Sequence, residues 1–186
     1  MSKLQNRKIA TLIAAVAIIA ATLLGTMVSL NRAASKVEDT FYSGVYLKSE
    51  GYTQPGIDAH LNSRIAAANG MLAIIGTYSE LDAETVAFRA ARENLINAER
   101  PAQKGRANDA MQQSFIALRD AAEEIEMSAR DISDLDKFYT TFNGAQAAIL
   151  GSGYNLNVLE FLDGTLGAFP VVVLKRLVPV RTPQMF

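Results

Sequence analysis

The sequence contains no cysteine and no tryptophan, and His60 is its only histidine. Without cysteine the chain has no disulfide, no thiolate metal ligand and no thiol nucleophile. The absence of cysteine does not identify the cellular compartment, because a cysteine-free chain is stable in oxidising and in reducing surroundings. One histidine cannot supply the paired Glu-x-x-His motifs of a di-iron bundle. We therefore expect no metal and no cofactor, and interpret His60 as a solvated or helix-capping residue.

An excess of charge of one sign is also missing. The chain has 18 lysines and arginines against 19 aspartates and glutamates, which gives a formal net charge of −1 at pH 7. Nucleic-acid-binding domains need a basic face, so nucleic acid is excluded as the main partner. Runs of β-branched residues are scarce between the N-terminal segment and residue 171, whereas alanine is abundant. This composition favours an all-α fold.

One long uncharged run lies near the N-terminus. Residues 9–30, IATLIAAVAIIAATLLGTMVSL, are about 22 in number and suffice to cross a hydrocarbon core of about 30 Å. The apolar core of a signal peptide is shorter, at about 7–15 residues, and the following NRAASKVEDTFY continues a helical pattern. We predict a transmembrane anchor over residues 9–30, with a cleaved signal peptide as the alternative.

The basic residues on either side of this run predict its orientation. Lys3, Arg7 and Lys8 precede it, whereas Arg32 and Lys36 follow it. The positive-inside rule then places residues 1–8 in the cytoplasm and the remainder on the extracytoplasmic side of the cell membrane. The prediction is therefore a single-pass membrane protein.

Apolar residues recur at intervals of three and four along the rest of the chain. Each such pattern gives a helix one apolar face, which must pack against another helix. Short breaks containing proline and glycine separate the patterns, and no alternation typical of a strand is present. We predict an antiparallel four-helix bundle within residues 31–170. The patterns cover residues 57–75, 79–98, 111–129 and 132–168, and one longer helix running to Ala98 is the alternative for the first two.

The stretch YNLNVLEFLDGTLGAFP, from Tyr154 to Pro170, is predicted to be the last core helix of the bundle, ended by its proline. The tail after it, residues 171–186, is β-branched, basic and interrupted by prolines, so we expect it to be irregular. It either folds back over the bundle, which we favour, or lies on the membrane with Lys175, Arg176 and Arg181 towards lipid phosphates.

Acidic residues gather in two places, EEIE at 123–126 and the aspartates of RDISDLDKF at 130–138. A hard cation held with waters is one interpretation of the first cluster. The second lacks the glycine and final glutamate of a calcium loop. We interpret both as solvated faces. Ser114 and Ser128 have no His–Asp partners within a recognisable motif, so hydrolase chemistry has no support.

Three tyrosines, Tyr42, Tyr46 and Tyr52, lie in or beside the segment GVYLKSEGYTQP. They are candidates for contact with a partner protein, because tyrosine is favoured in binding hot spots. Next to a membrane they suit the interfacial belt equally well. Packing of Tyr42 and Tyr46 on the bundle is the alternative.

Several segments together resemble the bacterial LemA family. NRAASKVEDTF, residues 31–41, is similar to the NRVEEAW-like stretch that follows the membrane helix in that family, and the segment from Tyr154 to Pro170 resembles its YN-x-x-V-x-x-YN-x-x-I-x-x-FP ending. The second YN is replaced by Phe161–Leu162, and GVYLKSEGYTQP is an apparent insertion. The family's ID-x-x-L-x-R-R region is matched in part, without its proline and one arginine, at Ile57, Asp58, Leu61, Arg64, Asn69, Met71 and Gly76.

The resemblance implies a diverged member with one membrane helix, an all-helical domain, an association with the cell envelope and no established enzymatic activity. We therefore expect a membrane-anchored scaffold or adaptor that binds an envelope protein and has no catalytic step. Self-association into a homo-oligomer is left open. The alternatives are a sensor or regulatory subunit coupled to the membrane helix, and a metal-binding bundle enzyme.

Overall fold

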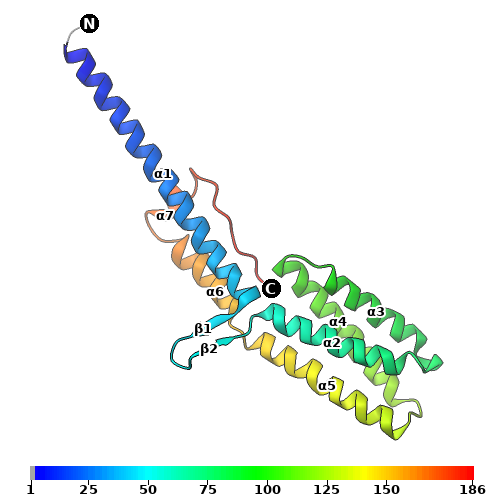
Figure 1. Cartoon of the computed structure of the whole chain (residues 1–186). Helices are drawn as coiled ribbons and strands as arrows, with labels where there is room; N and C mark the ends of the chain where they lie inside the picture. Colours follow the sequence, from blue (N-terminus) through cyan, green and yellow to red (C-terminus); the bar gives the residue numbers. More distant parts are fainter. Residues whose placement is uncertain (1–2) are drawn as a thin grey trace. The chain divides into compact units, whose positions relative to one another are not determined.

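The computed structural model describes residues 3–186. Met1 and Ser2, which belong to the predicted cytoplasmic segment 1–8, lie outside the described residues. The chain forms two compact units, which are described separately. Unit 1 comprises Met1–Glu38 and Leu156–Pro183, and unit 2 comprises Asp39–Asn155 and Gln184–Phe186. The predicted all-α fold is confirmed, since helices make up nearly all of the regular structure (Figure 1).

Helix α1, Lys3–Ser43, is continuous over 41 residues. Its apolar side chains are exposed through the uncharged run, with Leu12 at 65% and Ile18 at 67% of their full accessibility. The helix is long and apolar enough to cross a membrane, judged by length and composition. Beyond this run one face becomes buried at Leu30 and Ala34, so α1 passes into the folded part of unit 1 without a break.

The rest of unit 1 packs along α1 (Figure 1). It contains most of α6, Tyr154–Glu160, the π-helical turn η2, Phe161–Thr165, and the short α7, Val171–Leu174. Ala33, Val37, Leu162, Val171 and Val180 surround the core of this unit. That core consists of Leu30, Ala34, Phe161 and Leu166.

The prediction that Tyr154–Pro170 is the last core helix of the bundle is wrong. Regular α-helix ends at Glu160, and Phe161 and Leu166 pack on α1 instead. The helix loosens where the Leu166 N–H bonds to the Phe161 carbonyl, five residues back, and Gly164 and Gly167 lie on either side of Leu166. At Gly167 an added Cβ would lie 2.2 Å from the Asp163 carbonyl oxygen, so the backbone there turns too tightly for a side chain. Pro170 precedes α7 and does not end a long helix.

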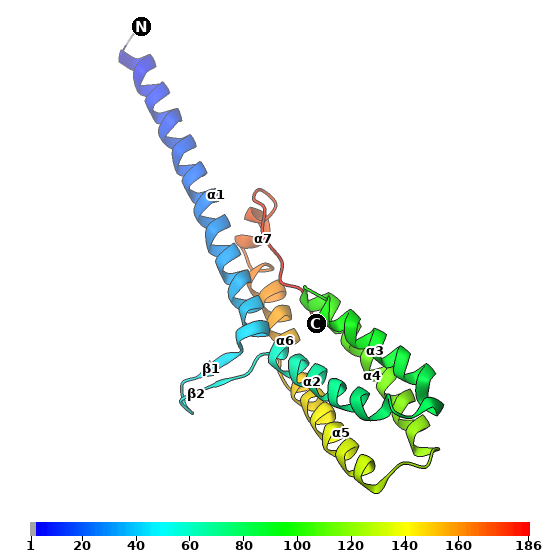
Figure 2. The ribbon, with the colours of Figure 1, turned by 45° about the vertical axis from the view of Figure 1, so that its right-hand side comes forward.

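Unit 2 is an antiparallel four-helix bundle, as Figure 2 shows. Its helices are α2, Ile57–Ile75, α3, Asp82–Ile96, α4, Pro101–Glu123, and α5, Ala129–Leu150, with a 3-10 turn η1 at Ser79–Leu81. Helix α2 packs mainly on α5, and α3 mainly on α4. Phe88, Phe115 and Phe142 are fully buried and form the aromatic centre of the bundle.

One of the breaks between the apolar patterns contains Pro101 and Gly105, yet Pro101 occupies the first position of α4. Proline is favoured there because the first turn of a helix needs no backbone N–H bond. The Gln103 side chain accepts a hydrogen bond from the Arg100 N–H at 3.2 Å and completes the helix start. The helix predicted over 111–129 therefore begins ten residues earlier than its apolar pattern indicated.

The sequence shows no strand alternation, but the structure contains two short strands within residues 45–54. Residues Val45–Leu47 form β1 and Tyr52–Gln54 form β2, an antiparallel hairpin in which Tyr46 pairs with Thr53. Gly44, at φ 79°, allows the chain to turn from α1 into β1, because an added Cβ there would lie 1.9 Å from the Gln54 carbonyl oxygen. Strands of three residues are too short to give a detectable alternation.

Candidate functional site

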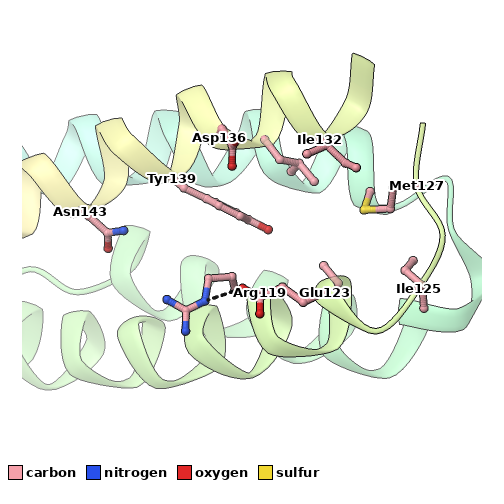
Figure 3. A pocket seen from close by; sticks show the side chains of 10 residues that line it. Arg119, Glu123, Ile125, Met127, Ile132, Asp136, Tyr139 and Asn143 are labelled. Carbon is pink, nitrogen blue, oxygen red and sulfur yellow. Dashed lines mark ion pairs between the residues drawn. The ribbon is translucent and has the colours of Figure 1, made fainter. Parts of the chain in front are cut away.

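The bundle contains a pocket between α4 and α5, with a volume of about 430 Å³ (Figure 3). Helix α4 and the α4–α5 connection form one side, and α5 forms the other. Polar side chains and apolar side chains both reach the cavity. The lining consists of Arg119, Ala122, Glu123, Ile125, Met127, Ile132, Leu135, Asp136, Tyr139 and Asn143.

Tyr139 projects from α5 across this pocket towards α4 (Figure 3). Its ring packs edge-on against Phe115, with 5.3 Å between the ring centres. The hydroxyl oxygen is buried and has no hydrogen-bond partner in the described structure. Burial raises the pKa of this phenol, and the nearby Asp136 carboxylate raises it further, so the hydroxyl stays protonated. The pocket therefore presents an O–H donor with nothing to accept its hydrogen.

Arg119 and Glu123 face Tyr139 from α4. The Arg119 Nε lies 3.6 Å from Glu123 Oε1, one helical turn on, and Arg119 Nη2 donates to Asp120 Oδ1 at 2.8 Å. The hydrogen bond to Asp120 is the largest cause of a raised pKa at Arg119. The Glu123 side chain is 70% exposed, as expected for the solvated face that the sequence predicts, and it also forms this ion pair. Within residues 3–186, no three acidic, histidine or cysteine residues are grouped so as to hold a metal ion.

Arg64 lies on α2 and is completely buried. Its guanidinium donates to the side-chain oxygens of Asn108 and Gln112 on α4 and of Gln146 on α5, the last at 2.5 Å. All three acceptors are neutral amides. Burial lowers the pKa of Arg64 to about 10, although Asp109 opposes the shift. The side chain stays charged at neutral pH and links three helices through amide groups.

A second polar cluster fixes the start of α5. The Tyr78 hydroxyl donates to Asp131 Oδ2 at 2.6 Å and accepts from the Ser128 N–H at 3.3 Å. The Ser128 hydroxyl caps the helix by accepting from the Asp131 N–H at 3.1 Å. These side-chain hydrogen bonds, with Tyr78 first, lower the pKa of Asp131. Asp131 was predicted to be part of a solvated face, but its carboxylate belongs to a helix cap.

The three tyrosines predicted as partner contacts lie in unit 2, in or beside the hairpin. Tyr46 and Tyr52 are 60% and 48% exposed on β1 and β2. Their register places them on opposite faces, because Tyr46 is opposite Thr53 and Tyr52 is opposite Leu47. Tyr42 lies on α1, where its hydroxyl donates to the Glu99 carbonyl at 3.1 Å and its ring contacts Phe41. The alternative interpretation was that Tyr42 and Tyr46 pack on the bundle, and of these two only Tyr42 makes such contacts.

The three basic residues of the tail all lie in unit 1. Arg181 forms an ion pair with Glu38, and its backbone N–H donates to Asn31 Oδ1 at 2.7 Å. Lys175 and Arg176 follow α7, with Arg176 exposed and Lys175 half-exposed. Residues 171–183 of the tail thus lie in unit 1, whereas only its last three residues belong to the bundle's unit, over which we expected the tail to fold. His60 lies half-exposed within α2, whose N-cap is Gly56, so it does not cap that helix.

The last three residues belong to unit 2 and are held by the side chains of the YN pair. The Tyr154 hydroxyl donates to the Gln184 carbonyl at 2.7 Å. The Asn155 side chain donates to the Phe186 carbonyl oxygen and accepts from the Phe186 N–H, both at 2.8 Å. An added Cβ on Gly105 would lie 2.9 Å from the Phe186 carbonyl carbon, so the glycine makes room for this residue. The sequence drew attention to Tyr154 and Asn155 but gave no sign that they bind the tail.

Comparison with known proteins identifies no relative. No family model, no curated protein and no solved structure matches the chain. The functional argument therefore rests on the chain's own residues.

Proposed function

We propose that this chain is a single-pass membrane protein of the bacterial cell envelope, a diverged relative of the LemA family, whose helical part binds another protein without catalysing a reaction. The exposed uncharged part of α1 supports the anchor, because in water so many exposed apolar side chains would be unfavourable. The continuous helix from this part into unit 1 makes the anchor part of the fold. The charge distribution supports an extracytoplasmic position for the helical part.

The β1–β2 hairpin is the observation that carries the binding proposal. It is the only sheet within residues 3–186, so each strand has one edge without a β-partner. A partner strand can add to such an edge, and side chains on alternate faces then supply specificity. Tyr46 and Tyr52 provide one exposed aromatic side chain on each face. Both features suit a contact made by main-chain pairing together with an aromatic anchor.

Photo-crosslinking in cells tests the binding proposal. A benzophenone amino acid replaces Tyr46 in the full chain, and the matched control carries it at Val86, which is 63% exposed on α3. We expect one crosslinked product of defined mass from position 46 and none from position 86. The proposal fails if both positions give the same products, or if position 46 gives none although the probe reacts with added hairpin-binding antibody.

A labelling experiment tests the orientation, since the chain has no native cysteine. The variants Ser49→Cys, at the exposed hairpin turn, and Ser2→Cys are treated in intact cells with a membrane-impermeant maleimide. Labelling of position 49 alone is the expected result. Labelling of position 2 alone would place the hairpin in the cytoplasm and redirect the search for partners there.

The pocket at Tyr139 favours a second candidate function, that of a regulatory subunit which senses a small molecule. Its volume of about 430 Å³ suits a small ligand, and the unpartnered hydroxyl suits a ligand with a hydrogen-bond acceptor. A thermal-shift screen of small amphipathic compounds tests it, with Tyr139→Phe as the matched control. A compound that stabilises the parent chain but not the variant would support sensing, and equal stabilisation of both would count against it.

A further inference from the structure

The chain between Leu166 and Pro179 forms a loop whose two ends are fixed to α1. On the incoming side, Phe161 and Leu166 pack against Leu30 and Ala34. On the outgoing side, the Pro179 carbonyl accepts a hydrogen bond from Asn31 Nδ2 at 3.3 Å. We call residues 167–178 the apical loop. Figures 1 and 2 both show α7, which lies in this loop, beside α1 at the end of the packed part of unit 1.

The apical loop lies where the uncharged run of α1 ends. Leu30 is the last residue of that run, and Arg32 is the first charged residue after it. Val171, the first residue of α7, packs against the cluster that contains Leu30. After the loop the chain returns away from the run, since Arg181 pairs with Glu38. The loop is therefore the part of the C-terminal segment nearest to the uncharged run.

The side chains of the apical loop have the composition of a membrane-interface segment. Phe169 is 84% exposed, Leu177 is 65% exposed and Val173 is 52% exposed. Lys175 and Arg176 lie between the last two of these, and residues 167–178 contain no acidic side chain. Exposed apolar side chains beside cations bind at the boundary between acyl chains and anionic headgroups.

We propose that the apical loop docks on the membrane surface beside α1, with Phe169, Val173 and Leu177 among the outer acyl carbons and Lys175 and Arg176 at anionic lipid phosphates. The proposal rests on the proposed membrane anchoring, which already holds the loop at the level of the bilayer surface. It gives unit 1 a second contact with lipid and fixes the end of the C-terminal segment against the bilayer. The proposal excludes a protein partner and a second copy of this chain as what covers the apical loop. The test distinguishes these two from lipid.

Tryptophan quenching measures this docking directly, because the chain has no tryptophan of its own. The full-length variant Phe169→Trp is reconstituted into phosphatidylcholine–phosphatidylglycerol vesicles that carry bromine at either shallow or deep acyl carbons. Ile18→Trp, in the middle of the uncharged run, reports on the anchor. Leu156→Trp is the matched control, since Leu156 is an apolar residue of the same unit with 70% exposure.

The expected result is strong quenching of Trp at position 169 by shallow bromines, weaker quenching by deep ones, and little quenching at position 156. The added pair Lys175→Gln and Arg176→Gln should reduce the quenching at position 169 by about half in anionic vesicles, because each cation contributes to surface attraction. The same pair should have little effect in vesicles of phosphatidylcholine alone.

Three results would overturn the proposal. Quenching at position 18 without quenching at position 169 rejects the docking and leaves the anchor intact. No quenching at either position rejects the anchor itself, and the docking with it. Blue-shifted emission at position 169 that depends on protein concentration and resists brominated lipid shows that a second copy covers the loop.

Discussion

The guanidinium carbon of Arg64 lies 3.9 Å from the ring centre of Phe142, over the face of the aromatic ring. The same guanidinium bonds to three amide side chains, so amide dipoles and a π face surround its charge, which the Asp109 carboxylate also favours. Such a group costs free energy to bury, yet each of the three amides accepts a hydrogen bond from it, and Gln146 accepts a second one from Asn108 at 3.1 Å. The charge therefore fixes how α2, α4 and α5 meet.

Replacing Arg64 by methionine should lower the free energy of unfolding by about 2–4 kcal/mol, because buried amide oxygens lose their donor. Chemical denaturation of the reconstituted full chain measures the change. The triple variant Arg64→Met, Asn108→Leu, Gln146→Leu also removes two of the three amide acceptors and leaves Gln112, which is only partly buried, so it should recover much of the loss. An equal loss in both variants would show that packing around the arginine, and not the amide network, matters.

Replacing Tyr139 by phenylalanine should raise the free energy of unfolding by about 1 kcal/mol, because the buried hydroxyl has no partner and its removal ends a desolvation cost. Tyr78→Phe is the natural comparison, since that hydroxyl makes two hydrogen bonds and its removal should destabilise the chain. Thermal unfolding of the two variants checks the opposite signs. A loss of stability in Tyr139→Phe would mean that the hydroxyl has a partner.

The Tyr78–Asp131 bond makes part of the stability depend on pH. An aspartate in the unfolded chain has a pKa of about 3.9, and hydrogen bonds hold the folded pKa of Asp131 lower. The cap therefore adds stability above about pH 4, and this contribution is lost as the pH falls through the folded pKa. In Tyr78→Phe the pKa of Asp131 should rise towards its ordinary value, as an NMR titration of the carboxyl carbon would record. An unchanged titration would assign the shift to Ser128 alone.

Gly70 on α2 allows close contact with α5, because an added Cβ would lie 2.3 Å from the Phe138 ring. Gly70→Ala should lower the free energy of unfolding by about 1–2 kcal/mol, since overpacking outweighs the gain in helix propensity. Gly144 provides the control, as it lies in α5 with no heavy atom within 4 Å of an added Cβ. Gly144→Ala should stabilise the chain by up to about 1 kcal/mol. Denaturant titrations of both variants decide whether the contact at Phe138 sets the difference.

Asn155 holds Phe186 by two hydrogen bonds, so Asn155→Ala should release the last residues from unit 2. Each bond contributes about 0.5–1.5 kcal/mol, and the amide of Phe186 should exchange its hydrogen roughly tenfold faster. The control is Asn157→Ala, an exposed asparagine two positions on. Hydrogen-exchange NMR compares the two, and identical exchange in both variants would show that Asn155 does not hold the tail.

The sequence was sufficient to predict the helical class and the continuous α1, because both follow from local composition and spacing. It was not sufficient to place the segment after Tyr154. A periodic apolar stripe indicates that a face is buried, but it does not identify the surface that covers it. The surface that covers Phe161 is formed by Leu30 and Ala34 of α1. Tertiary packing therefore decides that this segment packs on α1.

The pocket at Tyr139 could not be predicted from the sequence for a related reason. Arg119 and Tyr139 are twenty residues apart in the sequence, and only the antiparallel pairing of α4 and α5 brings them to one cavity. From the sequence, Asn108 is an ordinary polar residue of a helix, but in the structure it is only 1% exposed. Its burial depends on Arg64, which lies forty-four positions earlier. Such polar pairs across helices leave no periodic signal.

The uninterrupted α1 has an angular consequence. Each residue of an α-helix turns the chain by about 100°. The direction in which a side chain of the uncharged run points is therefore fixed by the number of residues between it and Leu30. One residue inserted next to Gly25, where an added Cβ meets nothing within 4 Å, would rotate residues 9–24 by about 100° relative to the Leu30 cluster. The continuous helix thus fixes, relative to the folded part of unit 1, which face of the run is turned towards a neighbouring helix in the membrane.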